Sequence, residues 1–405
     1  MTMLIHDGTI ITAIAGDVHV LPHHSLVIDA GRVAALAPAA TTPTAGHTTV
    51  VDARRHLVVP GLVNTHHHLF QPLTRCLPAA QNVRLFDWLL RLYEHWRGLD
   101  YAALKMAAEV SLAELALHGA TTTSDHQYMF PPHTDARIEA VLEAAETVGL
   151  RIHVCRGSMT LGQRDGGLPP DDCVERDADV LADCARVLDR WHDPAPHSLR
   201  RIDLAPCSPF NVTRELLRDT RVLARERGVL LHTHLAETRE EEAFCLDRFG
   251  CRPVQYLADL DWLGPDVYLA HCVCLNDAEV ALLGRTRTAV THCPSSNMRL
   301  SSGLAPVEAL LAAGARIGIG VDGSSSNDGG DLLGEARQVL LAARLRAALT
   351  RNSTAPADSS AGLFPARTAF ALATRGGADV LNRPELGHLA PGAAADLALY
   401  RADDI

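Results

Sequence analysis

The sequence predicts an α/β protein built around a distorted (β/α)8 barrel, and three observations support this prediction. Between about residues 59 and 380, short apolar segments alternate with longer amphipathic ones. Polar side chains stand at the ends of most short segments, as they do at the C-terminal face of such a barrel. The chain has 405 residues, 47% of them hydrophobic, which is enough for one large core or two smaller ones. An open, doubly wound sheet is the rival, but it does not explain so many polar strand ends.

Eight strands and their helices can be placed in order along this region. The strands are expected at residues 62–66, 120–125, 152–156, 202–206, 229–234, 267–271, 289–292 and 317–322. Amphipathic runs with helical periodicity lie between them, and they include 101–118, 137–148, 215–227 and 331–347. A small, polar segment with one proline, 350–360, is expected to be a loop.

Both ends of the chain show a different pattern. Residues 1–58 contain short β-rich runs that are followed by Gly or Asp, which predicts a small antiparallel sheet; these runs are 3–5, 25–29 and 49–51. Residues 392–400 look like one more strand of that sheet, and the little sequence that follows suggests a C-terminal truncation. We therefore expect two domains. Residues 1–58 and 385–405 form a terminal β domain, and residues 59–384 form the barrel domain.

Composition excludes several classes of partner. The net charge of −11 comes from scattered acidic residues, so nucleic acid is not an expected partner. No stretch reaches the roughly 18 apolar residues of a membrane span, and residues 1–8 lack the charged-then-apolar pattern of a signal peptide. The ten cysteines are scattered without a CxxC pair, which indicates reduced thiols. These features predict a cytoplasmic enzyme.

Consecutive histidines at the end of the first barrel strand are the most informative feature. Because side chains alternate along a strand, His66 and His68 face the same way and His67 faces the other way. Two imidazoles on one face form half of a site for Zn²⁺ or a similar divalent metal. A polar loop cluster is the alternative, but the other strand ends argue against it. They carry Asp125, Arg156, Cys207, His234 with Glu237, His271, His292 and Asp322.

These residue types indicate a hydrolytic metal site. Three histidines and a carboxylate can hold one metal with room for a water, and they are His66, His68, His234 and Asp322. Bound Zn²⁺ lowers the pKa of that water from about 15.7 to about 7. Asp322 can take the water's proton, Glu237 can protonate a ring nitrogen, and His271 can hydrogen-bond the attacking oxygen. His232 faces the same side as His234 and is an alternative ligand. His292 is interpreted as a core histidine.

The ordered motifs resemble the amidohydrolase superfamily, specifically its purine and triazine deaminase branch, over essentially the whole chain. The matching pieces are residues 60–68 (PGLVNTHHH), 234–237 (HLAE), 270–272 (AHC), 295–299 (SSNMR) and 320–323 (GVDG). The resemblance implies a β-sandwich that is formed by both chain termini beside the barrel. It also implies homo-oligomers and the ligands and catalytic residues named above.

The resemblance also bears on metal number. Binuclear members bridge their metals with a carboxylated lysine at the end of the fourth strand, where this chain has Cys207 and its neighbours. The only lysine, Lys105, lies in an expected helix. The family pattern therefore implies one divalent metal per subunit, Zn²⁺ or alternatively Fe²⁺.

Longer stretches look most like 8-oxoguanine deaminases, namely residues 78–81, 85–89, 156–159, 166–170 and 205–210. This resemblance implies hydrolysis of 8-oxoguanine to urate and ammonia. Guanine deaminases carry an arginine where Cys207 stands. Gln71, Arg156 and Trp88 complete the expected substrate-binding set, although each also has a structural interpretation. Related branches that act on hydroxyatrazine, isoxanthopterin or isocytosine remain alternatives. An inactive barrel scaffold is the alternative from another class, and metal content would distinguish it from an enzyme.

Overall fold

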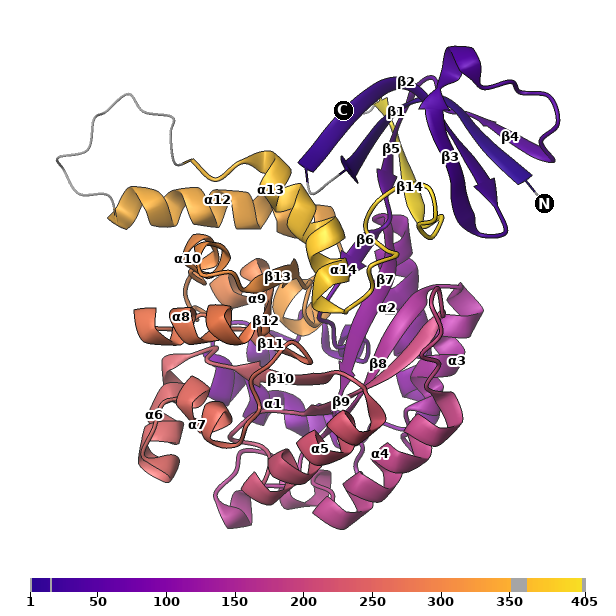
Figure 1. Cartoon of the computed structure of the whole chain (residues 1–405). Coiled ribbons are helices and arrows are strands. Elements are labelled where there is room, and N and C mark those ends of the chain that lie inside the picture. The colour runs from indigo at the N-terminus through magenta and orange to yellow at the C-terminus, as the bar shows by residue number, and fades with distance from the viewer. Residues whose placement is uncertain (1, 15–16, 351–362, 403–405) are drawn as a thin grey trace.

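The computed structural model describes residues 2–14, 17–350 and 363–402, and it shows a closed parallel barrel (Figure 1). The barrel strands pair in chain order and the last one pairs with the first. They are β6 (Leu62–Asn64), β7 (Ala120–Gln127), β8 (Arg151–Ser158), β9 (Arg200–Pro206), β10 (Leu231–Leu235), β11 (Val267–His271), β12 (Ala289–His292) and β13 (Arg316–Ile319). The predicted barrel is therefore confirmed, and the strand ends differ from the predicted ones by at most three residues.

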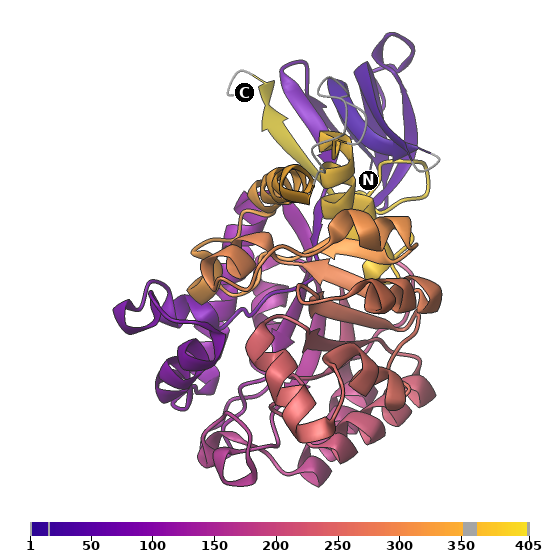
Figure 2. The same ribbon diagram turned by 90° about the vertical axis from the view of Figure 1, so that its left-hand side faces the viewer.

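Helices surround the barrel, and four of them match the predicted amphipathic runs 101–118, 137–148, 215–227 and 331–347. They are α1 (Leu85–Trp96), α2 (Tyr101–Leu117), α3 (Glu139–Val148), α4 (Asp177–Trp191), α5 (Arg214–Arg227), α6 (Arg239–Phe249), α7 (Pro253–Asp259), α8 (Asp277–Thr286), α9 (Pro294–Arg299), α10 (Val307–Ala312), α11 (Ser324–Asn327), α12 (Leu332–Thr350), α13 (Ala366–Ala371) and α14 (Gly377–Val380). Side-chain caps fix the start of several: Asp100 accepts from the N–H of Ala103 at α2, and Asn276 and Glu279 form a capping box at α8. Figure 2 shows the α1 segment projecting from one side of the barrel.

The terminal segments form one mixed sheet rather than the antiparallel sheet predicted for residues 1–58. Its strands are β1 (Thr2–Ile14), β2 (Asp17–Asp29), β3 (Arg32–Pro38), β4 (Thr49–Asp52), β5 (His56–Pro60) and β14 (Leu397–Arg401). The order is β14-β5-β1-β2-β3, β4 also pairs with β1, and β1 runs parallel to both β4 and β5. The described strands thus form one mixed sheet to which both chain termini contribute, beside the barrel, as the predicted terminal domain requires.

The first strand is longer than its sequence predicts. We expected a break after residue 5, at Asp7 and Gly8, but β1 continues through them to Ile14. Asp7 adopts a left-handed backbone with φ of 59°, and the register shifts between Ile5 and Gly8. This irregularity absorbs the turn residues without ending the strand, as a β-bulge does. The expected loop at 350–360 lies outside the described residues except for Thr350, which ends α12.

Strand β5 leads directly into the first barrel strand, so the sheet and the barrel share one continuous segment. Gly61 separates β5 from β6, and a Cβ there would lie 2.0 Å from the Thr121 hydroxyl oxygen. Only glycine fits this approach. The N–H of Gly61 donates to the carbonyl of Asp396, which precedes β14 (2.8 Å). Both ends of the chain therefore support the strand that leads into the histidine motif.

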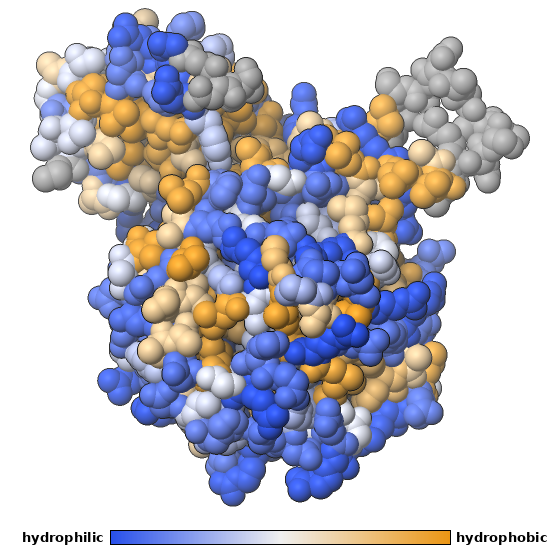
Figure 3. All heavy atoms as spheres, turned by 180° about the vertical axis from the view of Figure 1, so that it is seen from behind, coloured by the Kyte–Doolittle hydropathy of each residue, from blue (hydrophilic) through white to orange (hydrophobic). Residues whose placement is uncertain are grey.

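The surface and the thiols agree with the composition. On the face in Figure 3, apolar side chains gather on the terminal sheet and are interspersed with hydrophilic ones over the barrel. All ten cysteines are free, and most are buried. Among the helices that the structure describes, none combines the length and apolar character needed to cross a bilayer.

Candidate active site

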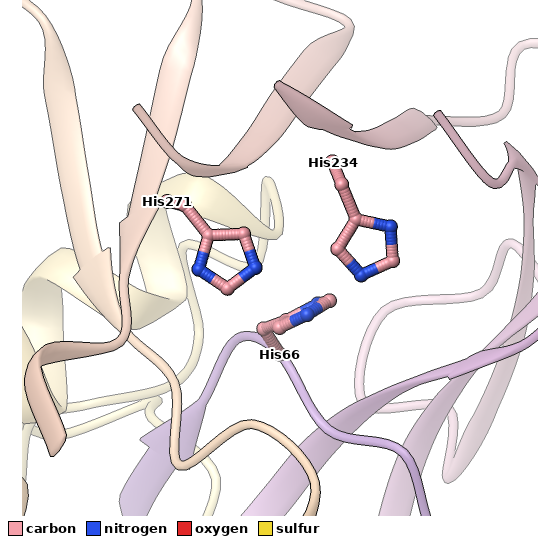
Figure 4. Close-up of side chains that lie close together, drawn as sticks. All are labelled: His66, His234 and His271. Carbon is pink, nitrogen blue, oxygen red and sulfur yellow. The ribbon is translucent and has the colours of Figure 1, made fainter. Parts of the chain in front are cut away.

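The predicted histidines and carboxylates converge inside the C-terminal mouth of the barrel. His66 and His68 follow β6, His234 lies in β10, and His271 ends β11. Asp322 follows β13 and forms an isolated bridge with His67, which fastens the last barrel strand to the first. Figure 4 shows the rings of His66, His234 and His271 facing a common centre from three separate strands. All of these side chains are buried.

Sharp backbone turns aim these groups inward. Four non-glycine residues at the strand ends adopt the left-handed region, namely Ala236 (φ 51°), His271 (φ 75°), Cys272 (φ 49°) and Asp322 (φ 61°). Such conformations are unfavourable for residues with a Cβ and concentrate at functional sites. Gly320 permits a second close approach, because a Cβ there would lie 2.6 Å from that of His66.

Four ligand atoms lie close together at the centre. Nε2 of His68 is 3.1 Å from Nε2 of His234. The Oδ1 atom of Asp322 is 3.3 Å from Nε2 of His68 and 3.5 Å from Nε2 of His66. Nε2 of His66 has no hydrogen-bond partner within the described ranges, although it is fully buried. An unpaired buried nitrogen of this kind needs a ligand or an ion to offset its desolvation.

Two of the three rings are held in one tautomer by backbone carbonyls. Nδ1 of His68 lies 2.9 Å from the carbonyl of His126, and Nδ1 of His234 lies 2.7 Å from that of Cys207. A carbonyl oxygen only accepts, so each Nδ1 must carry the proton. Because burial lowers the pKa of both imidazoles, they stay neutral, and each Nε2 presents a lone pair.

His232 fixes the third ring. Its Nδ1 donates to the carbonyl of Tyr268 (2.7 Å), which leaves its Nε2 as an acceptor. That Nε2 lies 2.8 Å from Nδ1 of His66, so Nδ1 of His66 is the donor and its Nε2 is a lone pair. Hence the hydrogen bond to His232 holds the ring of His66 in the tautomer that leaves its Nε2 unprotonated.

These lone pairs fit a divalent cation. Two neutral nitrogens that face each other at 3.1 Å cannot hydrogen-bond, because neither carries a proton. A metal between them, with the carboxylate of Asp322 as a further ligand, satisfies all four atoms. Partners behind the ligands that set their tautomers are characteristic of zinc sites.

His271 and Glu237 have the opposite proton arrangement. Nδ2 of Asn297 donates to Nδ1 of His271 (3.0 Å), so Nε2 of His271 carries a proton. That nitrogen lies 3.6 Å from Glu237 and 3.9 Å from Asp322. Burial lowers the pKa of His271 to about 4, which keeps the ring neutral. Burial, and then the charge of Asp322, raise the pKa of Glu237 well above its usual value, so its carboxyl retains a proton.

A pocket opens beside this centre. It contains three of the four predicted substrate-binding residues, namely Gln71, Trp88 and Cys207. Burial raises the pKa of the Cys207 thiol to about 12, so it stays uncharged. The pocket is lined by His68, Gln71, Leu85, Trp88, Leu89, Tyr128, Cys207, Ser208, Phe210, Asn211, His234, Glu237, His271, Leu300, Asp322 and Ser326.

Arg156, the fourth predicted substrate-binding residue, faces away from this pocket. Cys155 points into the barrel, where its thiol lies 3.1 Å from the hydroxyl of Tyr268. The next side chain along a strand points the opposite way. The guanidinium of Arg156 accordingly pairs with Glu175 (2.6 Å) and Asp183 (2.7 Å) on the outer side. Arg156 is therefore not among the residues that line the pocket.

Sequence reasoning missed several groups around the site. Asn297 lay inside a matched motif but received no role, and Ser208, Asn211 and Tyr128 were not considered. Glu241 was also missed; its carboxylate accepts from the backbone N–H groups of Ala236 and Glu237, and so holds the turn that carries Glu237. Asn297 contacts a distant strand that its motif does not indicate, and no motif marks the short-range contacts of Glu241.

Comparison with known proteins places this geometry in context. Residues 57–403 match the sequence profile of the amidohydrolase family. The chain is 46% identical over 380 residues to an 8-oxoguanine deaminase of Pseudomonas aeruginosa, covering 94% of this chain and 82% of that one. It is 37% identical over 372 residues to an isoxanthopterin deaminase of an unknown prokaryote, covering 90% and 77%. An atrazine chlorohydrolase of Arthrobacter aurescens, crystallised with zinc, has a TM-score of 0.92 and 32% identity, covering 99% and 87%.

Proposed function

The chain belongs to the amidohydrolase family, and on that premise we propose that it is a metal-dependent deaminase that converts 8-oxoguanine and water to urate and ammonia. The observation that carries this proposal is the division of protons within one pocket. Three histidine lone pairs face a carboxylate, whereas a protonated carboxyl and an imidazole N–H stand beside them. Hydrolytic deamination needs a metal site, a base and an acid together.

His66, His68, His234 and Asp322 would hold the metal in this proposal. Their facing lone pairs and the orphaned Nε2 of His66 support this assignment. When bound, a divalent metal lowers the pKa of a coordinated water and so makes a nucleophile available near neutral pH. Zn²⁺ is the proposed ion, since nitrogen and carboxylate ligands suit it, and Fe²⁺ is the alternative.

The side chains then supply the proton transfers. Asp322 takes a proton from the attacking water as the C2–O bond forms. Glu237, which is buried and protonated, gives its proton to the ring nitrogen beside C2, and the N–H of His271 hydrogen-bonds the attacking oxygen. Asp322 passes its proton to the amino group, the C2–N bond breaks, and ammonia leaves. The remaining hydroxyl proton returns to Glu237, so protons and atoms balance.

Two observations favour 8-oxoguanine over related substrates. The 46% identical relative is named for that reaction, and its match spans most of both chains. The pocket presents the neutral thiol of Cys207 where guanine deaminases resembling this chain carry an arginine. Gln71 also lines the pocket, and its Oε1 accepts from the N–H of Ser325 (3.3 Å).

Ammonia release from the metal-loaded protein tests the proposal. We would compare 8-oxoguanine, guanine, isocytosine, isoxanthopterin and hydroxyatrazine, with ethylamine assayed for the last. Fastest turnover of 8-oxoguanine to urate supports the proposed substrate. Turnover of a triazine or pterin alone would replace the substrate and keep the mechanism. No turnover by folded protein that holds about one metal would favour the scaffold alternative.

Two further expectations remain proposals. We propose a cytoplasmic location, which the ten free thiols support. We also propose a homo-oligomer, on the family resemblance alone, and light scattering after size-exclusion chromatography measures it directly.

A further inference from the structure

Three side chains that line the pocket carry buried polar atoms without a hydrogen-bond partner among the described residues. Trp88, Ser208 and Asn211 are 4%, 1% and 1% exposed. Trp88 Nε1, Ser208 Oγ and Asn211 Oδ1 have no hydrogen-bond partner among residues 2–14, 17–350 and 363–402. Because leaving a buried polar group unpaired is unfavourable, three such atoms in one pocket indicate groups that pair with a ligand.

The amide of Asn211 is held in a defined orientation. Its Nδ2 donates to the hydroxyl of Tyr93 (3.4 Å) and approaches the sulfur of Cys207 (3.3 Å). Its backbone carbonyl accepts from the N–H groups of Thr160 and Leu161 (2.9 and 3.0 Å). The amide therefore turns Oδ1, an acceptor, towards the unused position.

Trp88 supplies the complementary donor. An indole N–H can only donate. Trp88 belongs to α1, whereas Asn211 belongs to the segment between β9 and α5. These two segments pack together, since the rings of Phe86 and Phe210 lie 4.9 Å apart and Tyr93 of α1 meets Asn211. A donor and an acceptor thus line the same pocket. They come from a helix and a loop, whereas the reacting groups stand at the ends of barrel strands.

We propose that Trp88 and Asn211 recognise a ring edge that pairs a carbonyl with an adjacent N–H, with Ser208 as an additional contact. The inference rests on the proposed function and narrows its substrate class to fused 2-aminopyrimidinones whose second ring is oxidised to such a lactam. In 8-oxoguanine, the C8 carbonyl accepts from Trp88 and N7–H donates to Asn211. Guanine lacks the C8 carbonyl, and in its N9–H tautomer N7 is a lone pair that would oppose Oδ1 of Asn211. Isoxanthopterin also pairs an N–H with a carbonyl, at N8 and C7, where pterin has a lone pair and a C–H.

Two matched pairs of compounds test the inference: 8-oxoguanine with guanine, and isoxanthopterin with pterin. We would measure kcat/KM and, by calorimetry, Kd for each compound. A site built to pair with a lactam rejects the analogue that lacks it, so the wild type should prefer the oxidised member at least 100-fold. Asn211→Leu, which removes the acceptor, should reduce that preference at least tenfold. Asn211→Asp, which keeps an acceptor, should retain it.

Trp88→Phe is an independent variant, since it removes the N–H and keeps an aromatic ring. It should also reduce the preference at least tenfold, so the inference stays testable if Asn211→Leu does not fold. Gln255→Leu is the matched control, because Gln255 is an exposed amide on α7 whose partner is Asp259. Thermal melting and metal content would be compared for all variants.

The outcomes separate this inference from the proposed function. An active wild type without preference within either pair, or with a preference that survives both Asn211→Leu and Trp88→Phe, overturns the inference alone. A wild type that turns over none of the four compounds overturns the proposed function. In that case the binding data still decide, because equal Kd values within each pair would overturn the inference as well.

Discussion

The two sides of the pocket differ in how their polar atoms are satisfied. On the reaction side, each imidazole that faces the centre has its far nitrogen paired, with a carbonyl, with His232 or with Asn297. On the recognition side, Trp88, Ser208 and Asn211 keep an atom unpaired. Groups that must hold one protonation state are thus fixed in advance by the fold, whereas groups that identify a ligand are left open for it.

Asp322→Asn should cause the largest effect, because it acts at the centre of the reaction side. The amide cannot take the proton of water, so we expect kcat to fall by roughly 10³-fold or more. Ammonia release at matched metal content measures it. Asp219→Asn is the control, because Asp219 lies on α5, away from the pocket, is partly exposed and pairs with Arg218. Near-normal turnover in Asp322→Asn would remove Asp322 from the role of base.

Glu237→Gln should lower kcat/KM by about 10²–10⁴-fold, because it removes the proton donor. The raised pKa of Glu237 also sets a pH dependence. The protonated form is the active acid, so activity should fall on the alkaline side as pH rises through that pKa. The ring of His271, with its pKa near 4, should remain neutral above about pH 5. An alkaline limb that persists unchanged in the residual activity of Glu237→Gln would contradict this assignment.

His232→Phe tests whether the reaction side depends on support from behind. Phenylalanine can retain the stacking of His232 on Tyr268 but removes the acceptor for Nδ1 of His66. We expect metal affinity to weaken about 10–100-fold, since partners behind metal-binding histidines have effects of this size. Competition with a chromogenic chelator measures it. Unchanged affinity in a folded variant would mean that the tautomer of His66 is set by the metal alone.

Arg156→Met should have the smallest effect on the reaction, because Arg156 faces away from the pocket. KM of the folded protein should stay within about twofold. Stability should nevertheless fall by a value on the order of 3 kcal/mol, since Glu175 and Asp183 lose their buried partner. Chemical denaturation and steady-state kinetics measure the two effects. A large rise in KM without loss of stability would instead support the predicted role of Arg156 in substrate binding.

The sequence allowed the reaction side to be placed more completely than the recognition side, and the reason is physical. Strand periodicity and barrel topology bring strand ends together, so His66, His234, His271 and Asp322 could be grouped without coordinates. Trp88 was predicted as a substrate-binding residue, but its place beside the segment of Asn211 depends on the packing of a helix against a distant loop, which no periodicity reports. Arg156 stood at a strand end, but one residue of alternation turned it outward. The terminal sheet was predicted as antiparallel because the parallel pairing of β1 with β4 and β5 joins segments that are not adjacent in sequence.

The fixed tautomers have a consequence for how the apoprotein takes up its ion. The nitrogens proposed to bind the metal already carry no proton, since Nδ1 holds it on each ring. Loading should therefore displace almost no hydrogen ions from His66, His68 and His234, unlike a thiolate site, where deprotonation accompanies binding. At a pH below the pKa of the metal-bound water, the measured heat of metal uptake should then be nearly independent of the ionisation enthalpy of the buffer.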